Sequence, residues 1–186
     1  MSFQTPDKIV FAGPVGAGKT TAIGSVSEIE PIGTDVKATD QHAAIKEKTT
    51  VAMDYGFIRL RDGQQIHLYG TPGQDRFDFM WDVLTQNGLG LVLLVNVSRP
   101  DPVADLMYYL SAFESFISST GVAIGLTQCD KASKNIFDLI RGALEEKKML
   151  VPILEVDVRR QHDVTMLIHA LLAVLECKEK GYVNYN

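Results

Sequence analysis

The residues with the clearest chemical potential lie near the start of the chain, in the stretch GPVGAGKT at positions 13–20. It follows the short apolar stretch KIVFA (8–12) and precedes a segment with helical character. A glycine-rich loop with this G-x-x-x-x-G-K-T spacing surrounds phosphate oxygens with backbone N–H groups and with the positive end of a helix dipole. We expect Lys19 to reach the terminal phosphates and Thr20 to ligate Mg²⁺. The predicted phosphate-binding residues are Gly13, Gly16, Ala17, Gly18, Lys19, Thr20, Thr21 and, from the stretch described next, Gly73.

A second stretch, LYGTPGQDRF (69–78), also ends an apolar segment in a turn. Gly73 would offer a backbone N–H and Gln74 a carboxamide where a terminal phosphate would lie. Sites of this kind normally carry a carboxylate near the end of this strand, but the position holds Gly70. The sequence therefore raises the question of which residue supplies the acid.

We predict that Asp54, on the neighbouring strand, replaces the missing acid. Asp-Gly within 61–64 is a strong hairpin signal between two apolar stretches. If the first and last residues of that turn pair, Tyr55 lies opposite Gly70 and Asp54 lies opposite Thr71. A bulge, a twist or a bridging water is then needed to bring Asp54 into the site, acting on a Mg²⁺-bound water. Glycine at position 70 leaves room for the incoming carboxylate.

The remaining pattern predicts the elements that position these residues. Apolar stretches indicate strands at 8–12, 49–60, 64–70, 90–97, 122–130 and 151–158. Helical stripes indicate helices near 20–28, 101–117, 136–144 and 164–175, with a short helix near 77–81. Residues 29–48 lack clear periodicity and are interpreted as a mobile functional loop. The expected architecture is a three-layer α/β sandwich with a mostly parallel six-stranded sheet, one antiparallel edge hairpin, and ligands at the carboxyl ends of the strands.

Composition excludes several classes of function. The 186-residue chain has a net charge of −5, which disfavours a nucleic-acid or anionic-membrane surface. Its apolar runs are too short to span a bilayer, and it shows no signal-peptide or lipid-anchor pattern. Cys129 and Cys177 are expected to be reduced thiols, and the histidines form no zinc pattern. We expect one cytoplasmic domain, residues 1–186, without a membrane anchor.

Together the two glycine motifs resemble those of small Ras-like GTPases, most closely the bacterial MglA-type branch, over about residues 8–176. That branch carries T-V-P-G-Q without the usual acid, and this chain has the similar GTPGQ at 70–74. KTTVAMDY (48–55) is similar to the family's switch-I segment. The resemblance implies a P-loop small GTPase fold with GTP/GDP and Mg²⁺ as cofactors. It also implies that Gln74 orients the attacking water and that Thr50 binds the metal. With the arguments above, the predicted catalytic residues are Lys19 and Gln74, and the predicted metal residues are Thr20, Thr50 and Asp54.

The base-recognition motif of that family, N-K-x-D after the fifth strand, is only partly matched. The corresponding residues are Thr127, Gln128, Cys129 and Asp130. Asp130 could accept hydrogen bonds from guanine, Thr127 could offer a hydroxyl, and the stem of Gln128 could pack over the base. Asp157, Val158 and Arg159 stand where the family has S-A-K. An acidic turn and an exposed charged loop are the alternative interpretations of these two segments.

Three functions remain open at this point. The first is a GTP-hydrolysing switch, and the second is a pseudo-GTPase that binds a partner with little or no turnover. The third, a P-loop kinase of small metabolites, needs a basic lid, and the sequence has no cluster of arginines to form one. Thr49 stands where MglA-type proteins have a catalytic arginine, and the nearby cations are interpreted as surface charges.

The resemblance also implies partners: a roadblock-type GTPase-activating protein and an effector protein of unknown identity. Four bulky residues, Phe77, Phe79, Met80 and Trp81, lie within five positions after the GTPGQ motif. Since they cannot all face inward at helical spacing, some of them could form a partner patch.

Overall fold

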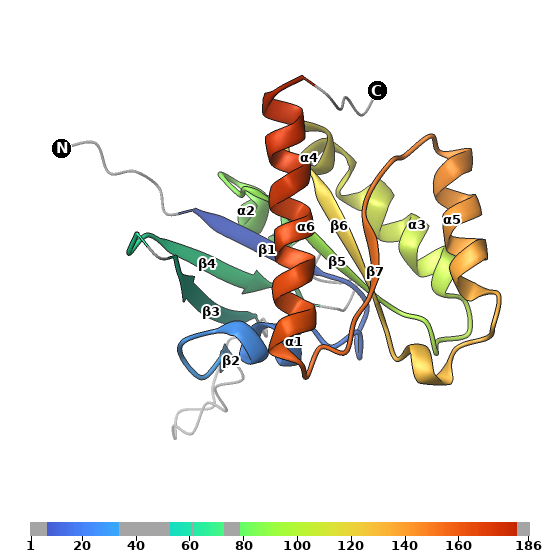
Figure 1. The fold of residues 1–186 in the computed structure, drawn as a ribbon, viewed down its shortest axis with the longest axis horizontal. Helices are drawn as coiled ribbons and strands as arrows, with labels where there is room; N and C mark the ends of the chain where they lie inside the picture. The colour runs from blue at the N-terminus through green and yellow to red at the C-terminus, as the bar shows by residue number, and fades with distance from the viewer. Residues whose placement is uncertain (1–6, 34–52, 61, 73–78, 182–186) are drawn as a thin grey trace, which may run out of the picture.

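The computed structural model describes residues 7–33, 53–60, 62–72 and 79–181 (Figure 1). Its centre is a seven-stranded sheet in the order β2-β3-β4-β1-β5-β6-β7. The strands are β1 (Lys8–Ala12), β2 (Ile32–Gly33), β3 (Asp54–Arg59), β4 (Gln65–Gly70), β5 (Gly90–Asn96), β6 (Val122–Thr127) and β7 (Ile153–Glu155). β3 runs antiparallel to both of its neighbours, β2 and β4, and the other adjacent strands are parallel to each other. The predicted α/β sandwich is confirmed, with the two-residue β2 as a strand that the sequence pattern did not indicate.

Helices cover both faces of this sheet (Figure 1). They are α1 (Lys19–Val26), α2 (Phe79–Thr85), α3 (Pro102–Ala112), α4 (Glu114–Ser119), α5 (Ile136–Glu146) and α6 (Gln161–Glu179). Side chains of α1 and α6 form one buried cluster with one face of the sheet, and α2 to α5 contribute to the cluster on the other face. The helix predicted to run from 101 to 117 is interrupted at Phe113, which ends α3 and precedes α4.

The two strands at the centre of the parallel part are fully buried, as their unbroken apolar sequences predicted. Every residue of β5 and β6 is buried. These strands form a rigid base for the loops at their carboxyl ends. Within the described residues, no helix combines the length and apolar character needed to cross a membrane.

The β3–β4 hairpin differs from the prediction by one residue in its register. Asp54 pairs with Gly70 and Tyr55 pairs with Tyr69. The turn closes through Leu60 N–H donating to Gln64 O at 2.8 Å, and Gly63 adopts a left-handed φ of 88°. The prediction that Asp54 faces Thr71 is therefore wrong. The observed pairing places Asp54 directly opposite the glycine that replaces the usual acid, without a bulge.

Candidate functional site

The carboxyl ends of the parallel strands border a cleft of about 1110 Å³. Most of the predicted site residues line it, from the glycine-rich loop, the start of α1, the end of β3 and the loops after β6 and β7. They are Gly16, Ala17, Gly18, Lys19, Thr20, Thr21, Asp54, Thr127, Gln128, Asp130, Asp157, Val158 and Arg159. Gly13 lies behind them, buried at the end of β1.

The glycines of the 13–20 loop are required by its shape. Gly13 has φ 139°, and a Cβ there would lie 2.1 Å from the Leu94 carbonyl oxygen. Gly18 has φ 95° immediately before α1, and a Cβ there would meet the Val158 side chain at 2.9 Å. Because both positions combine a backbone conformation that disfavours side chains with a close neighbour, glycine is the residue that fits them.

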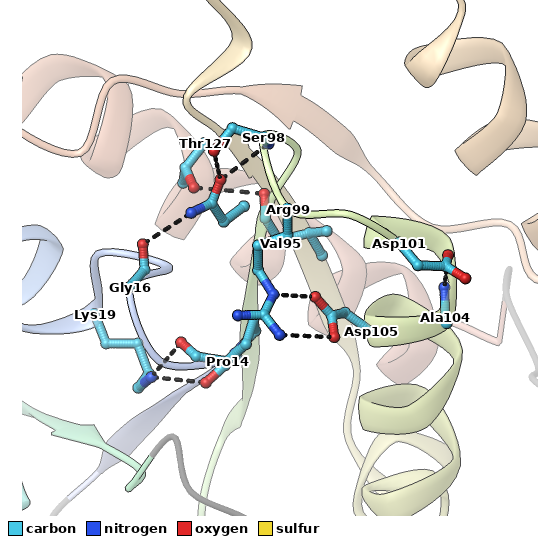
Figure 2. Close-up of polar contacts among 12 residues, drawn as sticks. Pro14, Gly16, Lys19, Val95, Ser98, Arg99, Asp101, Ala104, Asp105 and Thr127 are labelled. Atoms are coloured by element: carbon cyan, nitrogen blue, oxygen red, sulfur yellow. Dashed lines mark hydrogen bonds and ion pairs between the residues drawn. The ribbon is translucent and has the colours of Figure 1, made fainter. Parts of the chain in front are cut away.

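Lys19 is buried inside this loop. Its Nζ donates to the carbonyl oxygens of Gly13 at 2.6 Å and Pro14 at 3.0 Å (Figure 2). Burial lowers the pKa of Lys19 to about 8, while the Asp54 carboxylate acts in the opposite direction. An anionic ligand beside Lys19 would therefore stabilise its charged form.

Two polar residues tie this loop to the ends of the buried strands. Asn96, the last residue of β5, donates from Nδ2 to the Gly16 carbonyl oxygen at 3.2 Å. Thr127, the last residue of β6, donates from Oγ1 to the Ala17 carbonyl oxygen at 3.2 Å. Figure 2 shows Gly16 and Lys19 on the loop itself, and Thr127 beside Val95 near the end of β5. The loop is thus held in place by side chains as well as by its own backbone.

Asp54 reaches the start of α1 from β3. Thr20 Oγ1 donates to Asp54 Oδ2 at 2.7 Å. A Cβ at Gly70 would lie 3.0 Å from both Asp54 Cβ and Asp54 Oδ2, and 3.2 Å from Ile23 Cδ1. The glycine therefore makes the space that the carboxylate occupies, as the sequence suggested.

Mg²⁺ fits this donor set. A threonine hydroxyl and a carboxylate are the hard oxygen ligands that Mg²⁺ prefers, and it commonly takes its remaining ligands from phosphates and water. The described residues contain no group of three or more His, Cys, Asp or Glu side chains that could hold a metal without such help. Thr20 and Asp54 are accordingly the described residues that would hold the ion beside a bound nucleotide.

The loop after β6 is arranged differently from the prediction in one respect. Thr127 is 2% exposed, and its Oγ1 lies 3.2 Å from the Ala17 carbonyl oxygen and 3.4 Å from that of Val95. Its observed partner is therefore the phosphate-binding loop. Gln128 has a left-handed φ of 59° and accepts a hydrogen bond from Lys131 Nζ at 2.8 Å. Asp130 is exposed at the cleft, where a base could reach it.

In the loop after β7, the Asp157 carboxylate accepts several hydrogen bonds from Arg159. Arg159 donates from its backbone N–H, Nε and Nη2 to Asp157, at 3.1, 2.8 and 2.7 Å. These bonds hold the pKa of Asp157 at about 2. Asp163, in the first turn of α6, accepts a hydrogen bond from the Asp157 backbone N–H at 3.0 Å. Arg159 thus offsets the charge of Asp157. Within the described residues Asp130 forms no salt bridge, although, after the bonds to Asp157, its charge also contributes to raising the pKa of Arg159.

Cys129 lies between these two loops. Burial, followed by the neighbouring Glu155 and Asp130 carboxylates, raises the pKa of its thiol to about 11. The thiol is therefore protonated near neutral pH.

Several predicted residues lie outside the described part of the chain. They are Thr50, Gly73, Gln74 and Phe77, and the side chains of Phe79 and Met80. Their roles stay predictions. Trp81 is 5% exposed and stacks on Phe113 with ring centroids 4.8 Å apart, so it belongs to the core and not to a partner patch.

Sequence reasoning did not identify three residues that the structure brings to the site: Thr71, Asn96 and Asp163. Asn96 and Asp163 form hydrogen bonds with the backbone of neighbouring loops, and no local sequence motif predicts such contacts. Thr71 was visible as the residue after Gly70, at the end of a strand bordering the cleft. Its position next to the altered acid was the available signal.

Comparisons with known proteins agree with this geometry. Residues 30–177 match the model of a family described as conserved hypothetical ATP binding protein. The chain is 36% identical over 88 residues to the uncharacterized protein MJ1339 of Methanocaldococcus jannaschii, which is 47% of this chain and 49% of that protein. The match thus spans about half the length of this relative.

The fold is also similar to that of a solved protein, the bacterial selenocysteine-specific elongation factor EF-Sec. The similarity has a TM-score of 0.61 at 19% identity, and it covers 92% of this chain and 29% of the elongation factor. At this level of identity the likeness concerns the fold.

Proposed function

This chain belongs to the family described as conserved hypothetical ATP binding protein, and we propose that it is a GTP-hydrolysing switch. It is a P-loop nucleotide-binding protein. The family match begins at residue 30 and therefore does not include the 13–20 loop. The loop's own sequence and geometry supply that part of the argument.

The observation that carries the proposal is the meeting of three independent features in one cleft. The buried Lys19 ammonium lies in the glycine loop, the Thr20–Asp54 pair lies at one end, and Asp130 lies at the other. A phosphate-binding loop alone would serve many nucleotides and reactions. The addition of a metal-type oxygen pair and a base-side carboxylate favours a guanine nucleotide bound with Mg²⁺.

The roles of the residues follow from their chemistry. Lys19 would hold charge on the terminal phosphates, and the loop N–H groups would bind phosphate oxygens. Thr20 and Asp54 would hold the metal, together with Thr50. Mg²⁺, when bound, neutralises phosphate charge. Gln74 would orient the attacking water for displacement in line with the leaving oxygen.

Asp130 supports guanine over adenine. A carboxylate accepts hydrogen bonds from guanine N1–H and the exocyclic amine, whereas adenine N1 is itself an acceptor. The loop after β7 contributes Val158, whose backbone could contact the base. The family's description names ATP, so base choice is the feature of this proposal that a competition measurement decides most directly.

Two finer proposals rest on the GTPGQ motif. The first is membership of the MglA-type branch, with a bacterial origin and a cytoplasmic location. The second is regulation by a roadblock-type activating protein and an effector protein. The comparisons reported above name neither an MglA-type protein nor a roadblock-type partner, so the motif is their support.

The first test is turnover by the purified protein. Wild type is expected to bind GTP and hydrolyse it in the presence of Mg²⁺, slowly and without a second substrate. Gln74→Leu is expected to bind GTP with similar affinity and to hydrolyse it more slowly, because the lost interaction belongs to the transition state. Tight GTP binding without measurable turnover in wild type, with or without Mg²⁺, would favour the pseudo-GTPase instead.

The second test is base choice. Wild type is expected to prefer GTP to ATP in a competition assay. Asp130→Asn is expected to shift this preference towards xanthine nucleotides, because an amide can donate to the 2-oxo group. Equal displacement of a fluorescent nucleotide by ATP and GTP in wild type would contradict the guanine assignment and leave a P-loop protein of broader specificity.

A further inference from the structure

A buried threonine at the end of β4 carries a hydroxyl without a hydrogen-bond partner in the described part of the chain. Thr71 is 2% exposed, its Oγ1 makes no hydrogen bond, and the residue lines the cleft. Its backbone N–H donates to the Phe11 carbonyl oxygen at 2.8 Å, so the pairing of β4 with β1 fixes its position. A buried unsatisfied hydroxyl destabilises a protein, and an isosteric apolar residue would avoid that loss.

Thr127 provides an internal comparison. It is also 2% exposed and also lines the cleft, at the end of β6. Its hydroxyl donates to the Ala17 carbonyl oxygen, so its polarity is explained by the protein itself. The polarity of Thr71 is not explained in this way, which points to a partner that arrives with the ligand.

The sheet order indicates which part of a nucleotide lies near Thr71. The two loops proposed to contact the base follow β6 and β7, and the phosphate-binding loop follows β1. β4 is the neighbour of β1 on the side away from β6 and β7. A nucleotide that extends from the base loops across the glycine loop therefore directs its last phosphate towards β4 and β3.

Strand alternation separates Thr71 from the metal-holding pair. Asp54 and Gly70 are directly paired, so they share one face of the sheet. Thr71 is the next residue, and its backbone N–H continues the pairing with β1 by donating to the Phe11 carbonyl oxygen. Because side chains alternate along a strand, the Thr71 side chain projects from the opposite face of the sheet. Thr71 is thus placed to bind a different part of the phosphate group from the one that Thr20 and Asp54 serve.

We infer that the Thr71 hydroxyl donates a hydrogen bond to an oxygen of the terminal phosphate of a bound nucleoside triphosphate, an inference that rests on the proposed function. The donor is buried and already fixed, so little ordering is needed when the phosphate arrives. Thr71 would then distinguish the triphosphate from the diphosphate.

The test is Thr71→Val, which keeps the shape of the side chain and removes the hydroxyl. The empty variant is expected to melt at or above the temperature of wild type. In the presence of Mg²⁺, its affinity for GDP is expected to stay within about twofold. Its affinity for a non-hydrolysable GTP analogue is expected to fall about tenfold or more, as for the loss of a hydrogen bond to a charged group. Thr71→Ser, which retains the hydroxyl, is expected to keep the wild-type difference between the two nucleotides.

Thr127→Val is the matched control. Because it removes a hydroxyl that is already used by the glycine loop, it is expected to lower the melting temperature and to weaken both nucleotides alike. If Thr71→Val does not fold, Thr71→Ala provides the same comparison of GDP with the analogue.

Two results would overturn the inference: equal losses for GDP and the analogue in the Thr71 variants, or no loss for either. Failure of the proposed function would instead be seen in wild type itself, which would bind neither nucleotide, bind ATP and GTP equally, or bind GTP without hydrolysing it.

Discussion

At the scale of single residues, the molecule keeps a chemical group while changing the residue that supplies it. The end of β4 carries Gly70 in place of an acid, and β3 delivers Asp54 to the opposite position. The carboxylate accepts the Thr20 hydroxyl at 2.7 Å, in a space that a Cβ at Gly70 would close. The glycine and the aspartate are therefore best understood as one pair.

This pairing makes a prediction about exchanging the two residues. Asp54→Gly is expected to weaken Mg²⁺-dependent retention of nucleotide roughly 10- to 100-fold, the value of losing a charged hydrogen-bond acceptor. Adding Gly70→Asp is expected to recover part of that loss, since the acid returns from the facing position. The measurement is the dissociation rate of a fluorescent guanine nucleotide with Mg²⁺ and with a chelator. An Asp54→Gly variant with the same Mg²⁺ dependence as wild type would contradict the role of Asp54.

At the scale of elements, much of the architecture follows from the sequence because burial dictates its pattern. The strands at 90–96 and 122–127 are apolar except for their last residues, Asn96 and Thr127, and the structure buries every residue of both. The 13–20 loop could also be predicted, because the G-x-x-x-x-G-K-T spacing of its residues is local in the sequence. The two-residue β2 could not be predicted, since so short a strand depends on its pairing with β3 and has no periodicity of its own.

The hairpin register shows why the finer geometry escaped prediction. Asp-Gly fits a two-residue turn, but glycine in a left-handed conformation also closes a three-residue loop with a bulge. The chain uses Gly63 in the second way, which moves the pairing by one residue. The contact between the Thr127 hydroxyl and the Ala17 carbonyl oxygen could not be predicted either, because the two residues lie 110 positions apart in the sequence.

The junction between α1 and β3 gives an element-scale prediction. Ser27 Oγ accepts hydrogen bonds from the backbone N–H groups of Ile29 at 3.2 Å and Phe57 at 3.3 Å. A Cβ at Gly56 would lie 2.6 Å from that oxygen. Gly56→Ala is therefore expected to lower the free energy of unfolding by about 1–3 kcal/mol, because Ser27 must move.

Gly142, inside α5, is the matched control for this substitution. A Cβ there would meet no atom within 4 Å. Gly142→Ala is expected to raise the free energy of unfolding by about 0.5–1 kcal/mol through helix propensity. Denaturant unfolding measures both variants. Equal changes in the free energy of unfolding for the two variants would mean that the contact with Ser27 does not exclude a side chain at position 56.

At the scale of the whole molecule, the burial of the Lys19 charge costs stability, and a bound phosphate is expected to offset that cost. Lys19 is 8% exposed, and burial lowers its pKa from 10.5 to about 8. Between these two values the unfolded chain binds more protons than the folded one. The contribution of Lys19 therefore makes wild type progressively more stable, relative to a variant without this charge, as the pH rises from 8 to 10.5. Below pH 8 the full penalty of the buried charge is present.

The last prediction concerns Lys19→Met. The stability difference, wild type minus variant, is expected to rise by on the order of 3 kcal/mol between pH 7 and pH 10.5, from the size of the pKa shift. Denaturant unfolding of the empty proteins at several pH values measures it, with the exposed Lys147→Met as baseline. A flat difference would mean that Lys19 titrates as it does in the unfolded chain. Nucleotide should raise the melting temperature of wild type and leave that of Lys19→Met almost unchanged, because the phosphates stabilise a charge that the variant lacks. The residue that weakens the empty fold would then be the one through which the ligand stabilises it.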